Sequence, residues 1–312
     1  MSSMTVNSPL RGSRNATAII TLLIVATGWS LPCRAADPQP VIDMHLHTLW
    51  WQPDMKEPLT GLIAPHTREE LRNQTVREVT RWNVVRAVGS GADLAWYRPV
   101  LGKRLLPGLF VQGKPTVSVE SIREMFHRGE LAVLAEFAPQ YAGLAPDTPT
   151  LEPYWAVAEE LDLPVGIHMG LGPPGAAYHG QPEYRMQLSN PLLLENVLLK
   201  HSKLRVYVSH AGWPLGDEMV GLLYAHPQVY VDISVINWVL PRAEFHDYLR
   251  RLVNAGFDKR IMFGSDNMMW PESFGIAIGS IQSATFLTAD QKRDILCRNA
   301  ATFLRLEPTL CQ

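Results

Sequence analysis

Short apolar runs alternate with helix-like segments along almost the whole of this 312-residue chain. The runs VVRAVGS, LAVLAEF and RVYVSH are apolar nearly throughout, which is typical of parallel strands that are buried on both faces. We expect strands at residues 40–47, 84–90, 105–111, 131–137, 165–168, 204–210, 229–234 and 259–266. Eight strands that alternate with helices predict an α/β fold of the (β/α)8 TIM-barrel type, with a doubly wound open sheet as the alternative.

Local signals mark the ends of several of these elements. Thr67 and Glu70 have the spacing of a capping box, which predicts a helix at 67–82. Pro107 weakens the third expected strand, because proline has no N–H to donate to a neighbouring strand. A final helix is expected at 288–304.

The first 36 residues resemble a secretory signal peptide. Arg11 and Arg14 precede an uncharged apolar stretch, and a small-residue cleavage site follows at 33–36. The apolar core is short for a transmembrane span of about 20 residues, although an uncleaved anchor is the alternative. We therefore expect a signal peptide at 1–36, a periplasmic or secreted location, and one domain at 37–312 without membrane contact.

The bulk composition is that of an ordinary globular protein, with 46% hydrophobic residues, 19% charged residues and a net charge of −2. No run of Lys and Arg suggests a nucleic-acid partner. Cys33 lies at the edge of the expected leader, so Cys297 and Cys311 are the cysteines of the mature domain. In an oxidising compartment these two would either form a disulfide or remain independent thiols.

Side chains able to bind a metal stand at the carboxyl ends of five expected strands. His45 and His47 are two residues apart, so a strand directs both imidazoles to the same face. The other candidates are Glu136, His168, His210 and Asp266. Strand ends converge on one face of a barrel, so these imidazoles and carboxylates predict a site for a divalent metal.

The order of these residues resembles the amidohydrolase superfamily. The segments that carry the resemblance are VIDMHLH (41–47), PVGIH (164–168), VYVSHAGW (206–213) and IMFGSD (261–266). The branch that this chain resembles includes metal-dependent hydrolases and decarboxylases of the aminocarboxymuconate-semialdehyde type. The resemblance therefore supports the barrel fold and implies a metal-dependent enzyme.

The resemblance also implies roles for the strand-end residues. The implied metal ligands are His45, His47, Glu136, His168 and Asp266. Zinc fits this mixture of nitrogen and oxygen ligands best, and Glu136 would bridge the ions if there are two rather than one. Asp266 would also be a catalytic acid–base group. His210 would either bind a second ion or act as a further catalytic acid–base group.

The substrate is expected to contact the loops that follow the strands. Arg185, in the long loop 170–189, and the aromatic residues Trp213 and Trp270 are the candidates for substrate binding. The alternatives are that Arg185 is a solvated loop charge and that the tryptophans pack against helices. Five further histidines are expected at the surface; they are His66, His127, His201, His226 and His246.

The sequence thus predicts a metal-dependent hydrolase that uses metal-activated water on an amide, ester or lactone bond of a small molecule. The alternative within the same fold is a non-oxidative decarboxylase of an unsaturated or aromatic acid. A barrel that only binds a ligand is a third hypothesis, because fold does not fix function. A homo-oligomer is compatible with all three.

Overall fold

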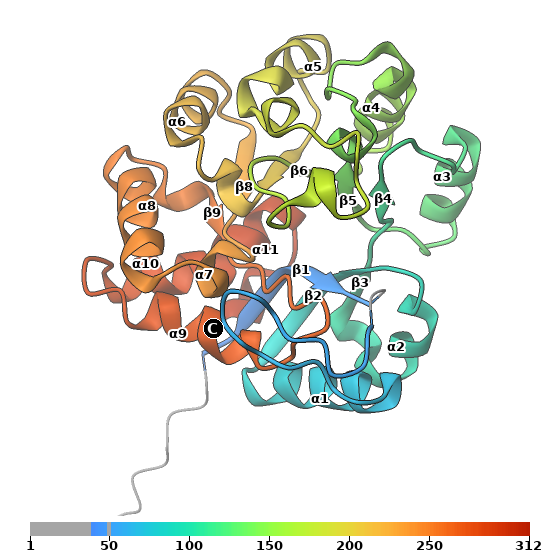
Figure 1. Cartoon of the computed structure of the whole chain (residues 1–312). Helices are drawn as coiled ribbons and strands as arrows, with labels where there is room; N and C mark the ends of the chain where they lie inside the picture. Colours follow the sequence, from blue (N-terminus) through green and yellow to red (C-terminus); the bar gives the residue numbers. More distant parts are fainter. Residues whose placement is uncertain (1–38, 49–50) are drawn as a thin grey trace, which may run out of the picture. The chain divides into compact units, whose positions relative to one another are not determined.

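A computed structural model of the chain describes residues 39–48 and 51–312, and residues 38–312 form one compact unit (Figure 1). The predicted signal peptide at 1–36 lies outside the described residues. Among the described residues, no helix is long and apolar enough to cross a membrane.

The strands form two parallel sheets that follow the chain order. The first sheet contains β1 (Val41–His47), β2 (Val84–Ser90) and β3 (Leu105–Pro107). The second contains β4 (Val111–Gln112), β5 (Leu134–Ala138), β6 (Val165–His168), β7 (Val206–Ser209), β8 (Val229–Asp232) and β9 (Ile261–Met262). Every paired strand is parallel to its neighbour, as expected when helices connect the strands.

Backbone hydrogen bonds join the two sheets into a closed barrel. On one side, the Met44 N–H donates to the Phe263 carbonyl at 3.0 Å and the Asp266 N–H donates to the His45 carbonyl at 2.7 Å. On the other side, the Leu109 N–H donates to the Val133 carbonyl at 3.1 Å. The helix-connected parallel strands and this closure confirm the predicted (β/α)8 barrel.

Two of the expected strands are shorter than predicted. The third is split at Pro107 into β3 and β4, because the proline nitrogen cannot continue the ladder. The eighth keeps regular pairing only at Ile261–Met262, and residues 263–266 turn towards β1 instead. The remaining expected strands are present with ends that differ by a few residues.

The helices surround the strands (Figure 1). They are α1 (Arg68–Arg81), α2 (Leu94–Leu101), α3 (Val119–His127), α4 (Glu152–Glu160), α5 (Glu195–Lys200), α6 (Gly216–Ala225), α7 (Ile236–Val239), α8 (Arg242–Asn254), α9 (Ser273–Gln282), α10 (Ala289–Arg293) and α11 (Asn299–Leu304). The capping box of Thr67 and Glu70 is formed at the start of α1. The expected helix at 288–304 is interrupted by a π-turn between α10 and α11.

Two histidines expected at the surface are buried instead. His201 is only 6% exposed, and its ring nitrogens lie 3.0 Å from the carboxylates of Glu152 and Glu159. His226 is 7% exposed and lies 3.6 Å from Glu195. The surface prediction was wrong for this pair, because carboxylates on neighbouring segments provide polar partners that make burial of an imidazole acceptable.

Cys297 and Cys311 form a disulfide that links the π-turn to the C-terminal tail. Both residues are buried and pack with Ile42, Met44 and Tyr207 in a cluster at the strands. Of the two alternatives left open by the sequence, the paired state is therefore the one that the fold contains.

We expect reduction of this disulfide to destabilise the domain. The bond closes a loop over a separation of 14 residues, which corresponds to roughly 3 kcal/mol of unfolding free energy. Urea unfolding with and without dithiothreitol measures the difference. The double variant Cys297→Ser/Cys311→Ser is the control, because its unfolding should not respond to the reductant. An equal midpoint for the wild type under both conditions would contradict the prediction.

Candidate metal centre

The six residues predicted from the strand ends lie together in the structure. His45 and His47 are on β1, Glu136 is on β5, and His168 ends β6. His210 follows β7 directly and Asp266 follows β9. All six side chains are buried. The Nε2 atoms of His45 and His47 are 3.1 Å apart, and His47 Nε2 lies 3.0 Å from Asp266 Oδ1. Residues more than 200 positions apart in the sequence thus share one site.

Glu136 lies between two pairs of histidines. Its Oε2 atom is 3.6 Å from His45 Nε2 and 3.8 Å from His47 Nε2. Its Oε1 atom contacts His168 Nδ1 and is 3.6 Å from His210 Nε2. The two rings of the second pair are also adjacent, with 3.2 Å between His210 Nε2 and His168 Nδ1. Each carboxylate oxygen therefore faces a different histidine pair, which is the geometry required of a ligand that bridges two ions.

Hydrogen bonds behind the histidines direct their lone pairs into the site. His45 Nδ1 lies 3.1 Å from Ser234 Oγ and 3.3 Å from Asp232 Oδ2, and His210 Nδ1 lies 3.0 Å from the same hydroxyl. The Ser234 hydroxyl itself donates to Asp232, so it is available to accept from both rings. His168 Nε2 lies 2.7 Å from the Leu171 carbonyl, which can only accept. These contacts assign the ring protons to the outer nitrogens and leave the inner nitrogens free to bind a metal.

Asp232 and Ser234 belong to the candidate site through their contacts with His45 and His210, and the sequence analysis did not include them. They stand at and just after the end of β8, the one strand between β6 and β9 to which no candidate was assigned. The pattern used for the other candidates, a polar residue at a strand end, applies equally to Asp232. Both side chains have no measurable exposure.

Asp43 fixes the position of the turn that carries Asp266. Its Oδ1 atom accepts from the Ser265 N–H at 2.8 Å and from the His45 N–H at 2.9 Å. Its Oδ2 atom accepts from the Ser265 hydroxyl at 2.6 Å. One buried carboxylate therefore ties β1 to the segment after β9, directly beside two of the ligands.

The backbone at two ligands is in an unusual conformation. His210 and Asp266 have φ angles of 58° and 45°, in the left-handed region that residues with a Cβ atom rarely adopt. Such conformations cost free energy and persist where the surrounding structure fixes them, which occurs often at functional sites. The hydrogen bonds from the His210 N–H to Asp232 and from the Asp266 N–H to the His45 carbonyl fix them here.

The charges of the site are suited to a bound cation. Burial by itself raises the pKa of Asp266, but the neighbouring His45 and His47 outweigh it and lower this pKa to about 2. Burial likewise opposes ionisation of Glu136, yet His168 and His45 hold its pKa well below the usual value. Conversely, burial disfavours protonation of His45, but Asp266 and Glu136 raise its pKa well above normal. The carboxylates thus remain ionised and require a nearby positive charge.

The donor set fits a divalent transition metal. It consists of imidazole nitrogens and carboxylate oxygens, which suit zinc and similar ions, and the rings are held in the tautomers that such binding requires. Among the described residues, no Lys or Arg forms an ion pair with Glu136 or Asp266. A metal is therefore the group that would neutralise these buried carboxylates.

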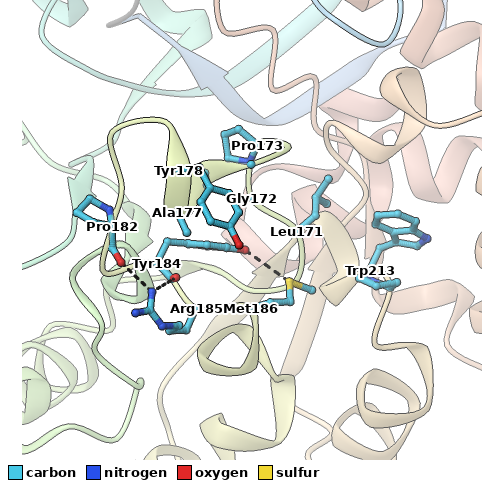
Figure 2. Close-up of a pocket in the computed structure, with 13 residues that line it drawn as sticks. Leu171, Gly172, Pro173, Ala177, Tyr178, Pro182, Tyr184, Arg185, Met186 and Trp213 are labelled. Carbon is cyan, nitrogen blue, oxygen red and sulfur yellow. Dashed lines mark hydrogen bonds between the residues drawn. The ribbon is translucent and has the colours of Figure 1, made fainter.

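A pocket is formed mainly by the loop that follows β6 (Figure 2), and the carbonyl of its lining residue Leu171 lies 2.7 Å from His168 Nε2. Its volume is about 680 Å³, and Arg185 and Trp213, two of the residues predicted to contact the substrate, are among those that line it. Arg185 is exposed, and its Nη1 donates to the carbonyls of Pro182 and Tyr184 at 2.8 and 2.7 Å. Trp270 does not line this pocket; it is 5% exposed, and its N–H donates to the Met55 carbonyl. The geometry therefore associates two of the three predicted residues with one pocket.

The chain belongs to the amidohydrolase family, which it matches over residues 42–306. Members of this family are enzymes, either hydrolases or decarboxylases, and they usually use a divalent metal. The protein fluG of Emericella nidulans is 22% identical over 160 residues, which are 46% of this chain and 18% of that protein. The matched segment thus spans less than a fifth of the length of that relative.

Solved structures of both reaction types have the same fold as this chain. A probable 2-pyrone-4,6-dicarboxylic acid hydrolase from Acinetobacter baumannii has a TM-score of 0.60 at 15% identity, covering 85% of this chain and 99% of that chain. A 2,6-dihydroxybenzoate decarboxylase from Rhizobium has a TM-score of 0.58 at 13% identity, covering 86% of this chain and 98% of that chain. These likenesses establish the fold and leave the reaction open.

We expect the variant Asp232→Asn to weaken metal binding by roughly 10- to 100-fold, because the neutral amide holds the His45 ring less well in its ligand orientation. Competition with a chromophoric zinc chelator measures the affinity. Asp247→Asn is the control, since Asp247 is exposed on α8 and pairs with Arg250. Equal zinc affinity for Asp232→Asn and wild type would show that the contact does not support the ligand.

Proposed function

We propose that this protein is a metal-dependent hydrolase that cleaves an amide, ester or lactone bond of a small molecule with metal-activated water. The observation that carries the proposal is the position of Glu136, whose two oxygens face different histidine pairs. A bridging carboxylate and four imidazoles would hold two ions at a short separation. Ions bound in this way would activate a water molecule and polarise the bond to be cleaved.

Asp266 is the proposed catalytic base. Its carboxylate is ionised at neutral pH, and its two oxygens point to different parts of the site: Oδ1 to His47 and Oδ2 to His210. Asp266 would accept the proton of the attacking water and return it to the leaving group. His210 would serve as a ligand through Nε2, because Ser234 holds its Nδ1.

The pocket beside the metal centre is the proposed substrate site. Leu171 and Trp213 line it, and these residues follow the ligands His168 and His210 by only three positions. The Trp213 side chain provides a flat apolar surface, and the Nη2 and Nε groups of Arg185 have no partner among the described residues. Arg185 would therefore bind an acidic group of the substrate. Trp270 would not contact the substrate directly but would support the edge of the substrate site.

Decarboxylation of an unsaturated or aromatic acid is the second candidate function. It is supported by the likeness to decarboxylases and by an exposed arginine at the pocket, which suits a carboxylate substrate. The proposed bridging position of Glu136 favours hydrolysis, because a second ion contributes most where a water molecule must be activated.

We also propose that the protein is exported. The disulfide between Cys297 and Cys311 supports this location, because such bonds persist in oxidising compartments. The leader predicted at 1–36 agrees with it. We propose that the protein can also form a homo-oligomer. Such association is compatible with a substrate site that opens at one end of the barrel.

We expect the purified protein, saturated with zinc and then desalted, to retain two metal equivalents per chain. Glu136→Ala should retain at most one equivalent, because this variant lacks the carboxylate that both ions would share. Metal analysis by mass spectrometry measures the content. His127→Ala is the control, since His127 is exposed on α3 and should leave the content at two. One equivalent in the wild type would contradict the two-ion site.

We expect hydrolysis in ¹⁸O-labelled water to place the label in a new carboxylate of the product. A panel of small amides, esters and lactones provides the substrates, and mass spectrometry detects the label. Asp266→Asn should lower the rate by at least about 100-fold through loss of the base, whereas Asp247→Asn should have the wild-type rate. Release of carbon dioxide without incorporation of the label would instead identify a decarboxylase.

A further inference from the structure

Tyr141 lies between the metal centre and the pocket. It belongs to the 3-10 turn Pro139–Ala142, which follows β5, the strand that carries Glu136. The edge of its ring packs against His168, with 5.4 Å between ring centroids. Its other neighbour is Tyr184, a residue that lines the pocket, at 5.0 Å. Tyr141 is thus in contact with a proposed metal ligand on one side and with the pocket wall on the other.

The hydroxyl of Tyr141 differs from the hydroxyls of four other tyrosines, which have hydrogen-bond partners in the protein. A buried tyrosine normally directs its hydroxyl to a hydrogen-bond partner. Tyr154, Tyr207 and Tyr248 follow this rule and donate to the carbonyls of Val117, Met44 and Ala211. Tyr184 is turned to the Gly170 carbonyl at 3.3 Å. The Tyr141 hydroxyl has no hydrogen bond to any residue in the part of the chain that the structure describes.

The position of this hydroxyl is not explained by packing alone. A half-buried ring fixed between His168 and Tyr184 keeps the hydroxyl in a restricted place. At neutral pH a phenol is protonated and can donate one hydrogen bond. The Tyr141 hydroxyl is therefore a hydrogen-bond donor that lies where a substrate would reach the metal centre.

We propose that Tyr141 donates a hydrogen bond to a substrate oxygen, and that this bond strengthens as negative charge develops on the oxygen during attack by water. This inference rests on the proposed hydrolase function. Tyr141 would then be a specificity-determining and catalytic residue that the sequence pattern of metal ligands does not include. A preorganised donor of this kind acts without reorganisation at the moment of reaction.

The test compares Tyr141→Phe with Tyr154→Phe in the zinc-loaded protein. The probe is phenylphosphonate, whose tetrahedral anionic group resembles the charge formed during hydrolysis. We expect its Kd, measured by calorimetry, to rise about tenfold or more in Tyr141→Phe, because a hydrogen bond to a charged group is lost. The control should bind within about twofold of wild type, since the Tyr154 hydroxyl donates to the Val117 carbonyl and lies outside the pocket lining.

A kinetic measurement gives an independent result for any panel compound that the wild type hydrolyses. We expect kcat of Tyr141→Phe to fall about 10- to 100-fold while the zinc content and melting temperature stay at wild-type values. A merely structural role would lower the melting temperature or the zinc content instead.

The two possible failures can be told apart. An unchanged Kd and an unchanged kcat in Tyr141→Phe would overturn the role of Tyr141 and leave the hydrolase proposal intact. A zinc-loaded wild type that neither hydrolyses a panel compound nor binds phenylphosphonate would overturn the proposed function, and the role of Tyr141 with it.

Discussion

The hydrogen bond from the Asp266 N–H to the His45 carbonyl, 2.7 Å long, joins the end of the barrel to its beginning. Because β1 comes first and residues 263–266 come last, no local interaction could bring them together. Asp43 supports the same junction through Ser265. This closure places Asp266 beside His47, so the metal centre exists only when the barrel is complete. Any change that opens the junction would therefore disrupt the site and the fold together.

Electrostatics explains why so many ionisable groups are tolerated in one buried place. The carboxylates of Glu136 and Asp266 face imidazoles, and the imidazoles face Asp232 and Ser234 behind them. Each polar group therefore has a partner, which is the condition for burying it at an acceptable cost. Although burial opposes it, the carboxylates raise the pKa of His45 and His210, so protons on these two rings balance part of the charge. A divalent cation would replace those protons and use the lone pairs already directed inward.

Much of this organisation was predictable from the sequence. The alternation of apolar runs and helices predicted the barrel, and polar residues at five strand ends predicted the six residues that lie together in the candidate site. Features that depend on spatial neighbours were not predictable in this way. Pro107 divides a strand whose two halves pair with different partners, and His201 is buried because Glu152 and Glu159 lie beside it. Asp232 was missed although it stands at a strand end, because its role is visible only from its contact with His45.

The sequence by itself determined the order of the elements and the kinds of ligand, because hydrophobic periodicity and side-chain chemistry are local properties. Only the tertiary structure decided that Glu136 lies between two histidine pairs. It also decided that Trp270 lies in the core while Trp213 lines the pocket. The same holds for the Tyr141 hydroxyl, which has no hydrogen-bond partner among the described residues. Those facts depend on distances between residues far apart in the chain. Such distances are set when the barrel closes and its helices pack around it.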